Sequence, residues 1–272
     1  MVGQMTSRLS LPRHPLLPDL QCSRAVLVGC DDGVPRQHQW GPEKMATNLA
    51  DALTAPDTAV AFRPTHTQVL LNPGHPDEIL GAVRTAAAAA TDTLLFYFVG
   101  RTSPHRRVPG EPQPGPNRAE DVVGSLGEVS KIIGDSEAVR SVVVLDGVGH
   151  RLFQEHTPTS FLLGGSSFGP PDGDQLCSFT PTLVSGLANG VRDGPEMLDL
   201  LTLRNAVDAS FYEARYCIED HWVVGPSRLT VHHPSRFRMV ALGANPVFGE
   251  AGRHRTGGLL RNEDAVDQAY DW

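Results

Sequence analysis

Three residues that could take part in chemistry follow an apolar run in the middle of the chain. The run covers 142–145, directly after Arg140 and Ser141, and Asp146, Gly147 and His150 come after it. A β-branched run that stops at turn residues predicts a strand buried on both faces of a parallel sheet, and ligands bind such sheets at the carboxyl ends of their strands. We therefore expect a carboxylate, an imidazole and a flexible backbone amide at a binding edge, where an anion or a carbonyl oxygen can be held.

The run at 140–146 resembles the nucleophile strand of the caspase-like cysteine peptidases, which share the caspase and metacaspase fold. In that family Val-Val-Leu-Asp-Cys-Cys is followed by His or Phe, Ser and Gly, and the second cysteine attacks the peptide. Val148 stands at the position of this cysteine. Because a valine side chain cannot act as a nucleophile, the resemblance implies that this half of the dyad is missing.

A second apolar run, at 93–100, resembles the family strand that carries the general base. The family writes Tyr-Tyr-Ala-Gly-His-Gly, whereas this chain has Arg101 in place of the histidine. Arginine stays protonated at physiological pH and has no acceptor nitrogen, so it cannot take a proton from a thiol. The proline-rich stretch at 102–119 stands where relatives usually carry an apolar hairpin-like segment that helps to wall the cleft.

Periodicity and turn residues predict strands that alternate with helices. The predicted strands are 24–29, 66–71, 92–100, 140–146 and 237–243, and the predicted helices are 43–54, 76–90, 124–139 and 196–217. The resemblance to the caspase-like family implies a further strand at 159–167 and a helix that starts at 179 and continues to about 191. Alternation of this kind is typical of an α/β protein. The resemblance implies a three-layer α/β/α sandwich with a mostly parallel, roughly six-stranded caspase-like sheet. It covers about 23–247, between an N-terminal tail at 1–22 and an acidic C-terminal tail at 248–272.

Composition narrows the classes of function. A chain of 272 residues with 40% hydrophobic residues can bury one large core. The net charge of -8 argues against nucleic-acid binding. The four cysteines have no C-x-x-C spacing and no signal peptide is apparent, which favours a reducing cytoplasm. The longest apolar runs are too short to span a bilayer, and the near-exclusive use of arginine over lysine suggests a GC-rich bacterial genome.

Neither a metal nor another cofactor is expected. His221, His232 and His233 form the only histidine cluster in the sequence, and adjacent histidines on an extended segment point to opposite sides. No phosphate-binding glycine motif follows a predicted strand. His105 and His150 lie close in sequence to the two substituted dyad positions, but a histidine on the surface or in a loop is the commoner interpretation.

Two candidate residues keep alternative interpretations. In relatives that cut after Arg or Lys, the acid at the position of Asp146 lines the specificity pocket, but an acid at a strand end also caps the following helix. Cys30 follows the first predicted strand, and in this fold that turn opens toward the cleft. A migrated thiol–imidazole pair with His150 is one hypothesis, and apolar packing of the cysteine is the other.

With both dyad positions substituted, the resemblance implies a catalytically degenerate domain, a pseudo-peptidase that binds a protein or peptide partner. The candidate binding residues are Arg101, Asp146, Gly147, His150 and Cys30. We also expect Arg101 to form an ion pair with Asp146 or with an acid of the adjoining loops. The alternative is an enzyme whose cleft has been rebuilt on the same scaffold for a reaction other than Cys-His proteolysis. The oligomeric state is not predicted.

Overall fold

The computed structural model describes residues 17–30, 41–55, 61–100, 118–146, 160–164, 179–217 and 240–248. Five strands form the central sheet: β1 (Arg24–Cys30), β2 (Thr67–Leu71), β3 (Thr93–Gly100), β4 (Arg140–Asp146) and β5 (Ser160–Gly164). The α-helices are α1 (Pro42–Thr54), α2 (Pro76–Ala89), α3 (Arg118–Gly134), α4 (Phe179–Asn189) and α5 (Leu200–Cys217). Two short 3₁₀ helices, η1 (Pro64–His66) and η3 (Pro246–Phe248), precede β2 and follow the last strand.

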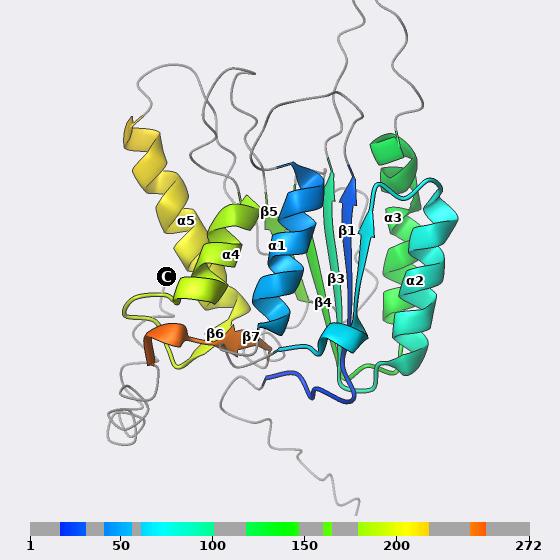
Figure 1. The fold of residues 1–272 in the computed structure, drawn as a ribbon, viewed down its shortest axis with the longest axis horizontal. Coiled ribbons are helices and arrows are strands. Elements are labelled where there is room, and N and C mark those ends of the chain that lie inside the picture. Colours follow the sequence, from blue (N-terminus) through cyan, green and yellow to red (C-terminus); the bar gives the residue numbers. More distant parts are fainter. Residues whose placement is uncertain are drawn as a thin grey trace, which may run out of the picture.

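All neighbours in the central sheet are parallel, in the order β2-β1-β3-β4-β5. Every residue of β3 and of β4 is buried, as expected for strands with helices on both faces. The strands point the same way in Figure 1, so their carboxyl ends lie together along one edge, which we call the carboxyl edge. The prediction of an α/β fold with a parallel sheet is confirmed.

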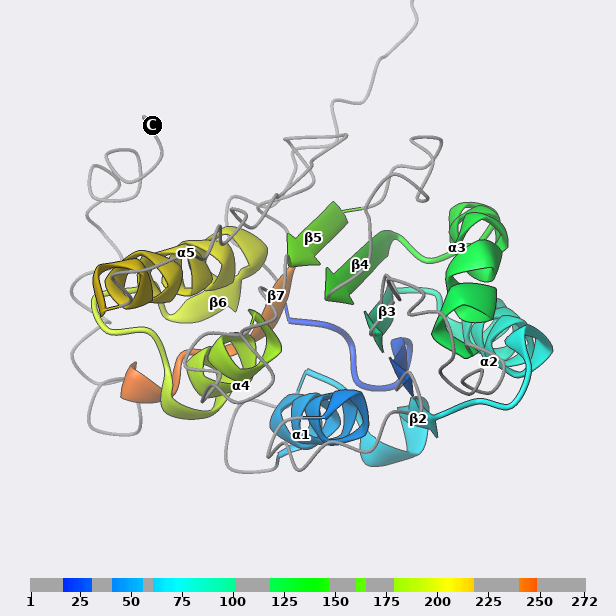
Figure 2. The same ribbon diagram turned by 90° about the horizontal axis from the view of Figure 1, so that it is seen from above.

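Side chains alternate between two helical layers. Leu27, Tyr97 and Val144 belong to one buried cluster with residues of α1, α4 and α5. Val28, Phe98 and Leu145 belong to a second cluster, with residues of α2 and α3. Figure 2 shows the sheet between these two groups of helices. The three-layer arrangement therefore follows from the period of two along each strand.

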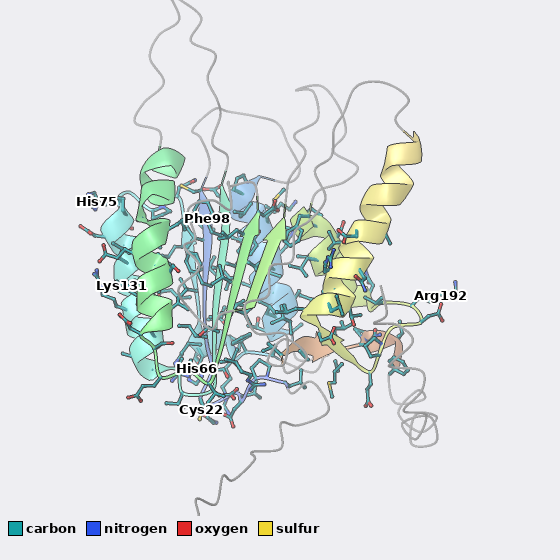
Figure 3. All side chains as sticks on the ribbon, turned by 180° about the vertical axis from the view of Figure 1, so that it is seen from behind. Cys22, His66, His75, Phe98, Lys131 and Arg192 are labelled. Atoms are coloured by element: carbon teal, nitrogen blue, oxygen red, sulfur yellow. The ribbon has the colours of Figure 1, made fainter. Side chains whose placement is uncertain are left out.

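The opposite edge, which we call the amino edge, is crossed by residues 17–23, the N-terminal strap. The carbonyl oxygen of Cys22 accepts hydrogen bonds from the amides of Thr91 at 2.9 Å and Asp92 at 3.1 Å. Figure 3 shows Cys22 and His66 at this end of the sheet and Phe98 near the other end. The last six residues of the expected N-terminal tail, 17–22, are thus bonded to the base of the sheet.

An ion pair between Arg140 and Asp92 closes the amino edge, where the Arg140 side chain is only 7% exposed. The Asp92 carboxylate also accepts from the amide of Asp19 at 2.7 Å and from the hydroxyls of Ser23 and Thr93 at 3.0 Å. Burial favours a higher pKa for Asp92, but the bonds from Arg140 and Asp19 and the positive charge of Arg140 hold its pKa below the ordinary value. The negative charge therefore stabilises the fold.

The sixth expected strand does not join the central sheet in the described residues. β7 (Ala241–Ala244) pairs antiparallel with β6 (Met197–Asp199), a short strand where the sequence predicted the start of a helix. The helix α5 begins only at Leu200, and the Asp199 carboxylate accepts from the amide of Thr202 at 2.7 Å. An aspartate in this capping position favours a helix start after it, which leaves 197–199 extended.

Asn245 fastens this second sheet to the loop after α4. Its side chain is bonded to the amide of Val191 at 3.0 Å, to the carbonyl of Val191 at 2.8 Å and to that of Pro195 at 3.0 Å. Gly190 lies next to it with a φ of +83°. A Cβ atom at position 190 would come within 2.3 Å of Asn245 Oδ1. Both the dihedral angle and the close approach require glycine there.

Candidate functional site

The candidate site is the part of the carboxyl edge where β3 and β4 end. The two strands are neighbours, with Val99 in register with Asp146. Arg101 follows β3 in the sequence, and Gly147, Val148 and His150 follow β4, but these four residues lie outside the described ranges. Asp146 and Cys30 are the predicted site residues that the structure describes. The expected pair between Arg101 and an acid stays a prediction.

Asp146 is fully buried and is bonded to the start of α4. Its Oδ2 atom accepts from the backbone amide of Thr180 at 3.2 Å and from the Thr180 hydroxyl at 2.6 Å. Thr180 is the second residue of α4, where backbone amides lack partners inside the helix and a negative charge is favoured. The geometry is that of a helix cap supplied from a distant strand.

Tyr97 is hydrogen-bonded to Thr180 as well, so Tyr97, Thr180 and Asp146 are linked in series. Its hydroxyl lies 2.7 Å from Thr180 Oγ1. The Thr180 hydroxyl has one hydrogen, and a carboxylate only accepts, so that hydrogen goes to Asp146. Tyr97 must then be the donor to Thr180. The 2.6 Å separation of Thr180 Oγ1 from Asp146 Oδ2 is typical of an O–H donating to an ionised carboxylate.

The surroundings keep the Tyr97 hydroxyl protonated. Burial raises the pKa of Tyr97, and the negative charge of Asp146 raises it further, against a smaller lowering by the hydrogen bond with Thr180. The pKa of Tyr97 therefore lies well above 10.0. A neutral phenol is the form that can donate to Thr180, so the direction of the pKa change agrees with the order of the hydrogen bonds.

Cys30 reaches the same edge but lies on the other face of the sheet. It is in register with Gly100, one residue beyond the row that contains Val99 and Asp146. Its side chain is fully buried in the cluster with Ile79 and Phe98, on the side of α2 and α3. Since successive residues of a strand face opposite sides, the thiol and the carboxylate of Asp146 do not share one face.

The start of α1 is also fixed at this edge. A Cβ atom at Gly29 would lie 2.5 Å from the carbonyl oxygen of Pro42, so the end of β1 touches the first turn of α1. Asn72 joins them, because its amide donates to the Gly29 carbonyl at 2.8 Å and its side chain donates to Glu43. Both α1 and α4 therefore begin at the carboxyl edge (Figure 1).

The described ranges contain neither a metal-binding cluster nor a membrane-spanning helix. No group of three or more His, Cys, Asp or Glu residues within them is placed to hold a metal ion. In the same ranges, no helix is both long enough and apolar enough to cross a membrane.

Sequence reasoning did not anticipate the roles of Tyr97 and Thr180. From the sequence, Thr180 was expected only to lie at the start of a helix and Tyr97 only to lie in a buried strand. The available signal was a hydroxyl-bearing tyrosine inside an otherwise apolar run, because a buried phenol requires a hydrogen-bond partner. That signal identifies Tyr97 but not its partner, which lies 83 residues away.

Comparison with known proteins found similar solved structures, but no match to a family model or to a curated protein. One similar solved structure is caspase-1 from Spodoptera frugiperda, with 14% identity over 85% of this chain and 93% of that chain and a TM-score of 0.46. Another is pro-Sf-caspase-1, with 14% identity over 88% and 100% of the two chains and a TM-score of 0.44.

Proposed function

We propose that this chain is a caspase-like domain that has lost peptidase chemistry and binds a protein or peptide partner at its carboxyl edge. The proposal starts from the residues: the runs at 93–100 and 140–146 resemble the two strands of the family dyad, with Arg101 and Val148 at the dyad positions. An arginine and a valine supply neither a general base nor a nucleophile. Loss of both groups on a retained scaffold favours a binding role.

One structural observation supports this proposal most directly. β3 and β4 are adjacent parallel strands, and Val99 is in register with Asp146. The two substituted positions therefore follow neighbouring strand ends, two residues after Val99 and two after Asp146 in the sequence. A pair of strands in this arrangement can bring the residues after them to one place, as a dyad requires.

The rebuilt-enzyme alternative loses support from the position of Cys30. Its side chain is fully buried and faces α2 and α3, away from Asp146. A nucleophilic thiol must be reachable and partly ionised. We expect Cys30 to react with an alkylating reagent near neutral pH only after denaturation, and peptide mapping of the alkylated protein measures this.

The absence of proteolysis is tested with fluorogenic peptides that end in Arg, Lys or Asp. Purified protein is expected to cleave none of them faster than buffer does. Reproducible cleavage that alkylation abolishes would show that the chain is an enzyme. The double variant Arg101→His with Val148→Cys is expected to remain inactive as well, because the stretch at 102–119 lacks the apolar wall of the relatives and a misplacement of about 1 Å costs on the order of a hundredfold in rate.

The binding role is tested with an immobilised random peptide library and two charge-reversal variants. Arg101→Glu changes the proposed binding edge, whereas Arg84→Glu makes the same change on an exposed helix, where Arg84 pairs with Glu128 at 3.0 Å. We expect peptides selected on the wild type to bind Arg101→Glu at least about tenfold more weakly and Arg84→Glu with unchanged affinity. Equal affinity for all three proteins would place binding away from this edge.

A further inference from the structure

We infer that Asp146 is a positioning residue, which holds α4 on the carboxyl edge together with Tyr97 and Thr180, and that it is not a recognition residue for a basic side chain. The link between this role and partner binding rests on the proposed function. The position of α4 itself does not, so the inference can be tested without a partner.

Burial is the first support. The side chains of Tyr97, Thr180 and Asp146 are all fully buried, and Oδ2 of Asp146 takes two hydrogen bonds from one residue, Thr180. Asp146 is 0% exposed, so a ligand cation could reach its carboxylate only by displacing groups packed against it, of which Thr180 is one. Displacement of Thr180 would remove the cap of α4 and leave a buried amide and hydroxyl without their acceptor, which is costly.

The connectivity of the chain is the second support. Tyr97 belongs to β3, Asp146 to β4 and Thr180 to α4, so the two hydrogen bonds from Tyr97 through Thr180 to Asp146 join three elements. Apolar contacts also hold α4 against the sheet, since Phe179 and Leu183 of α4 belong to the same buried cluster as Val142 and Val144 of β4. The apolar contacts keep α4 on the sheet. The hydrogen bonds at the first turn of α4 fix its position along the helix axis.

This placement matters for binding because α4 starts at the edge where β3 and β4 end. Any partner that meets the residues following these strands also lies near the first turn of α4. Thr180 and Tyr97 act on such a partner only through the position of the helix. Their replacement should therefore weaken the binding of basic and neutral peptides alike.

Hydrogen exchange at the amide of residue 180, followed by NMR, tests the positioning role. Thr180→Val keeps the shape but removes the hydroxyl, and its protection factor is expected to fall about tenfold or more. Thr180→Ser restores a hydroxyl and should stay within about threefold of wild type. Asp146→Asn is a second test, because its neutral amide oxygen is a weaker acceptor. The protection factor of the residue 180 amide is expected to fall about threefold to tenfold in this variant. Unchanged protection in both Thr180→Val and Asp146→Asn would overturn the inference.

A control and a ligand probe complete the test. Asp199→Asn alters the equivalent cap of α5, on the amide of Thr202, and should leave protection at residue 180 unchanged; if it lowers it equally, the effect is general loosening and the inference fails. Benzamidine, a small aryl amidinium ion, imitates a basic side chain. We expect it to shift the melting temperature of wild type and of Asp146→Asn equally. Stabilisation of the wild type alone would make Asp146 a recognition residue.

These measurements separate the two proposals. If the library yields no peptide while exchange at residue 180 responds as expected, the positioning role stands and the binding function fails. If peptides bind and exchange does not respond, the binding function stands and the positioning role fails.

Discussion

Arg140 forms an ion pair with Asp92 at the amino edge, between the first residue of β4 and the residue that precedes β3. The same carboxylate receives the amide of Asp19 from the N-terminal strap at 2.7 Å. A single acid thus joins two strands of the sheet to the strap.

Removal of the arginine is expected to be costly. Arg140→Ala leaves the Asp92 carboxylate in a partly buried site without its cation, and we expect the free energy of unfolding to fall by about 3 kcal/mol. Arg84→Ala breaks an exposed pair and should cost at most about 1 kcal/mol. Urea denaturation of both variants measures the difference, and similar losses would show that Arg140 contributes no more than a surface charge.

Low pH should weaken the ion pair between Asp92 and Arg140. Because the pKa of Asp92 is lower in the folded protein than in an unfolded chain, its contribution is fully present above the unfolded pKa of about 3.9 and is lost as the pH falls through the folded value. Asp19, whose pKa is lowered by hydrogen bonds from the amides of Cys22 and Gln21, acts in the same direction. We expect Asp92→Asn to show a smaller loss of stability between pH 5 and 2 than wild type, by thermal melts; parallel curves would contradict this.

Tyr97 should fail to ionise in the folded protein. The chain has four tyrosines, and the raised pKa of Tyr97 means that the folded state keeps its proton above pH 10. The unfolded chain releases that proton at about pH 10, so stability is present below this pH and declines above it. Absorbance at 295 nm should show a late phenolate step that coincides with unfolding. Tyr97→Phe should lack this step, and its persistence would assign it to another tyrosine.

The side chain of Asn245 should contribute strongly to the free energy of unfolding. It is almost fully buried, and Asn245→Ala would remove three hydrogen bonds to Val191 and Pro195. We expect a loss of about 2 to 4 kcal/mol in urea denaturation. The matched control is Asn189→Ala, which removes an exposed bond to Ser185 and should cost less than about 0.5 kcal/mol. Equal effects would mean that water replaces the partners of Asn245.

The elements with strong local signals were predicted closely from the sequence. The strand at 140–146 matches β4 residue for residue, and the helix predicted at 76–90 is observed at Pro76–Ala89. Proline at the first position and acids in the first turn mark that start. His75 adds a capping box with Glu78, whose side chain accepts from the His75 amide at 3.1 Å.

Elements whose limits depend on distant partners were predicted less well. The helix predicted at 124–139 is observed at Arg118–Gly134. Three of the four residues at 118–121 are charged, so this first turn shows no apolar period. β6 has only three residues, too few for a period of two, and its partner β7 lies far along the sequence. The hydrogen bonds of Asp92 and of Thr180 link residues far apart in the sequence, and no spacing rule connects them.

The N-terminal strap also has a consequence for how the protein is made. Leu17 accepts a hydrogen bond from Arg140 across 123 residues of chain. At about 5 to 20 residues per second, a ribosome needs roughly 6 to 25 s to add that length. The first described residues of the protein are therefore synthesised before every strand that they join, and they reach their final place only when β4 has left the ribosome.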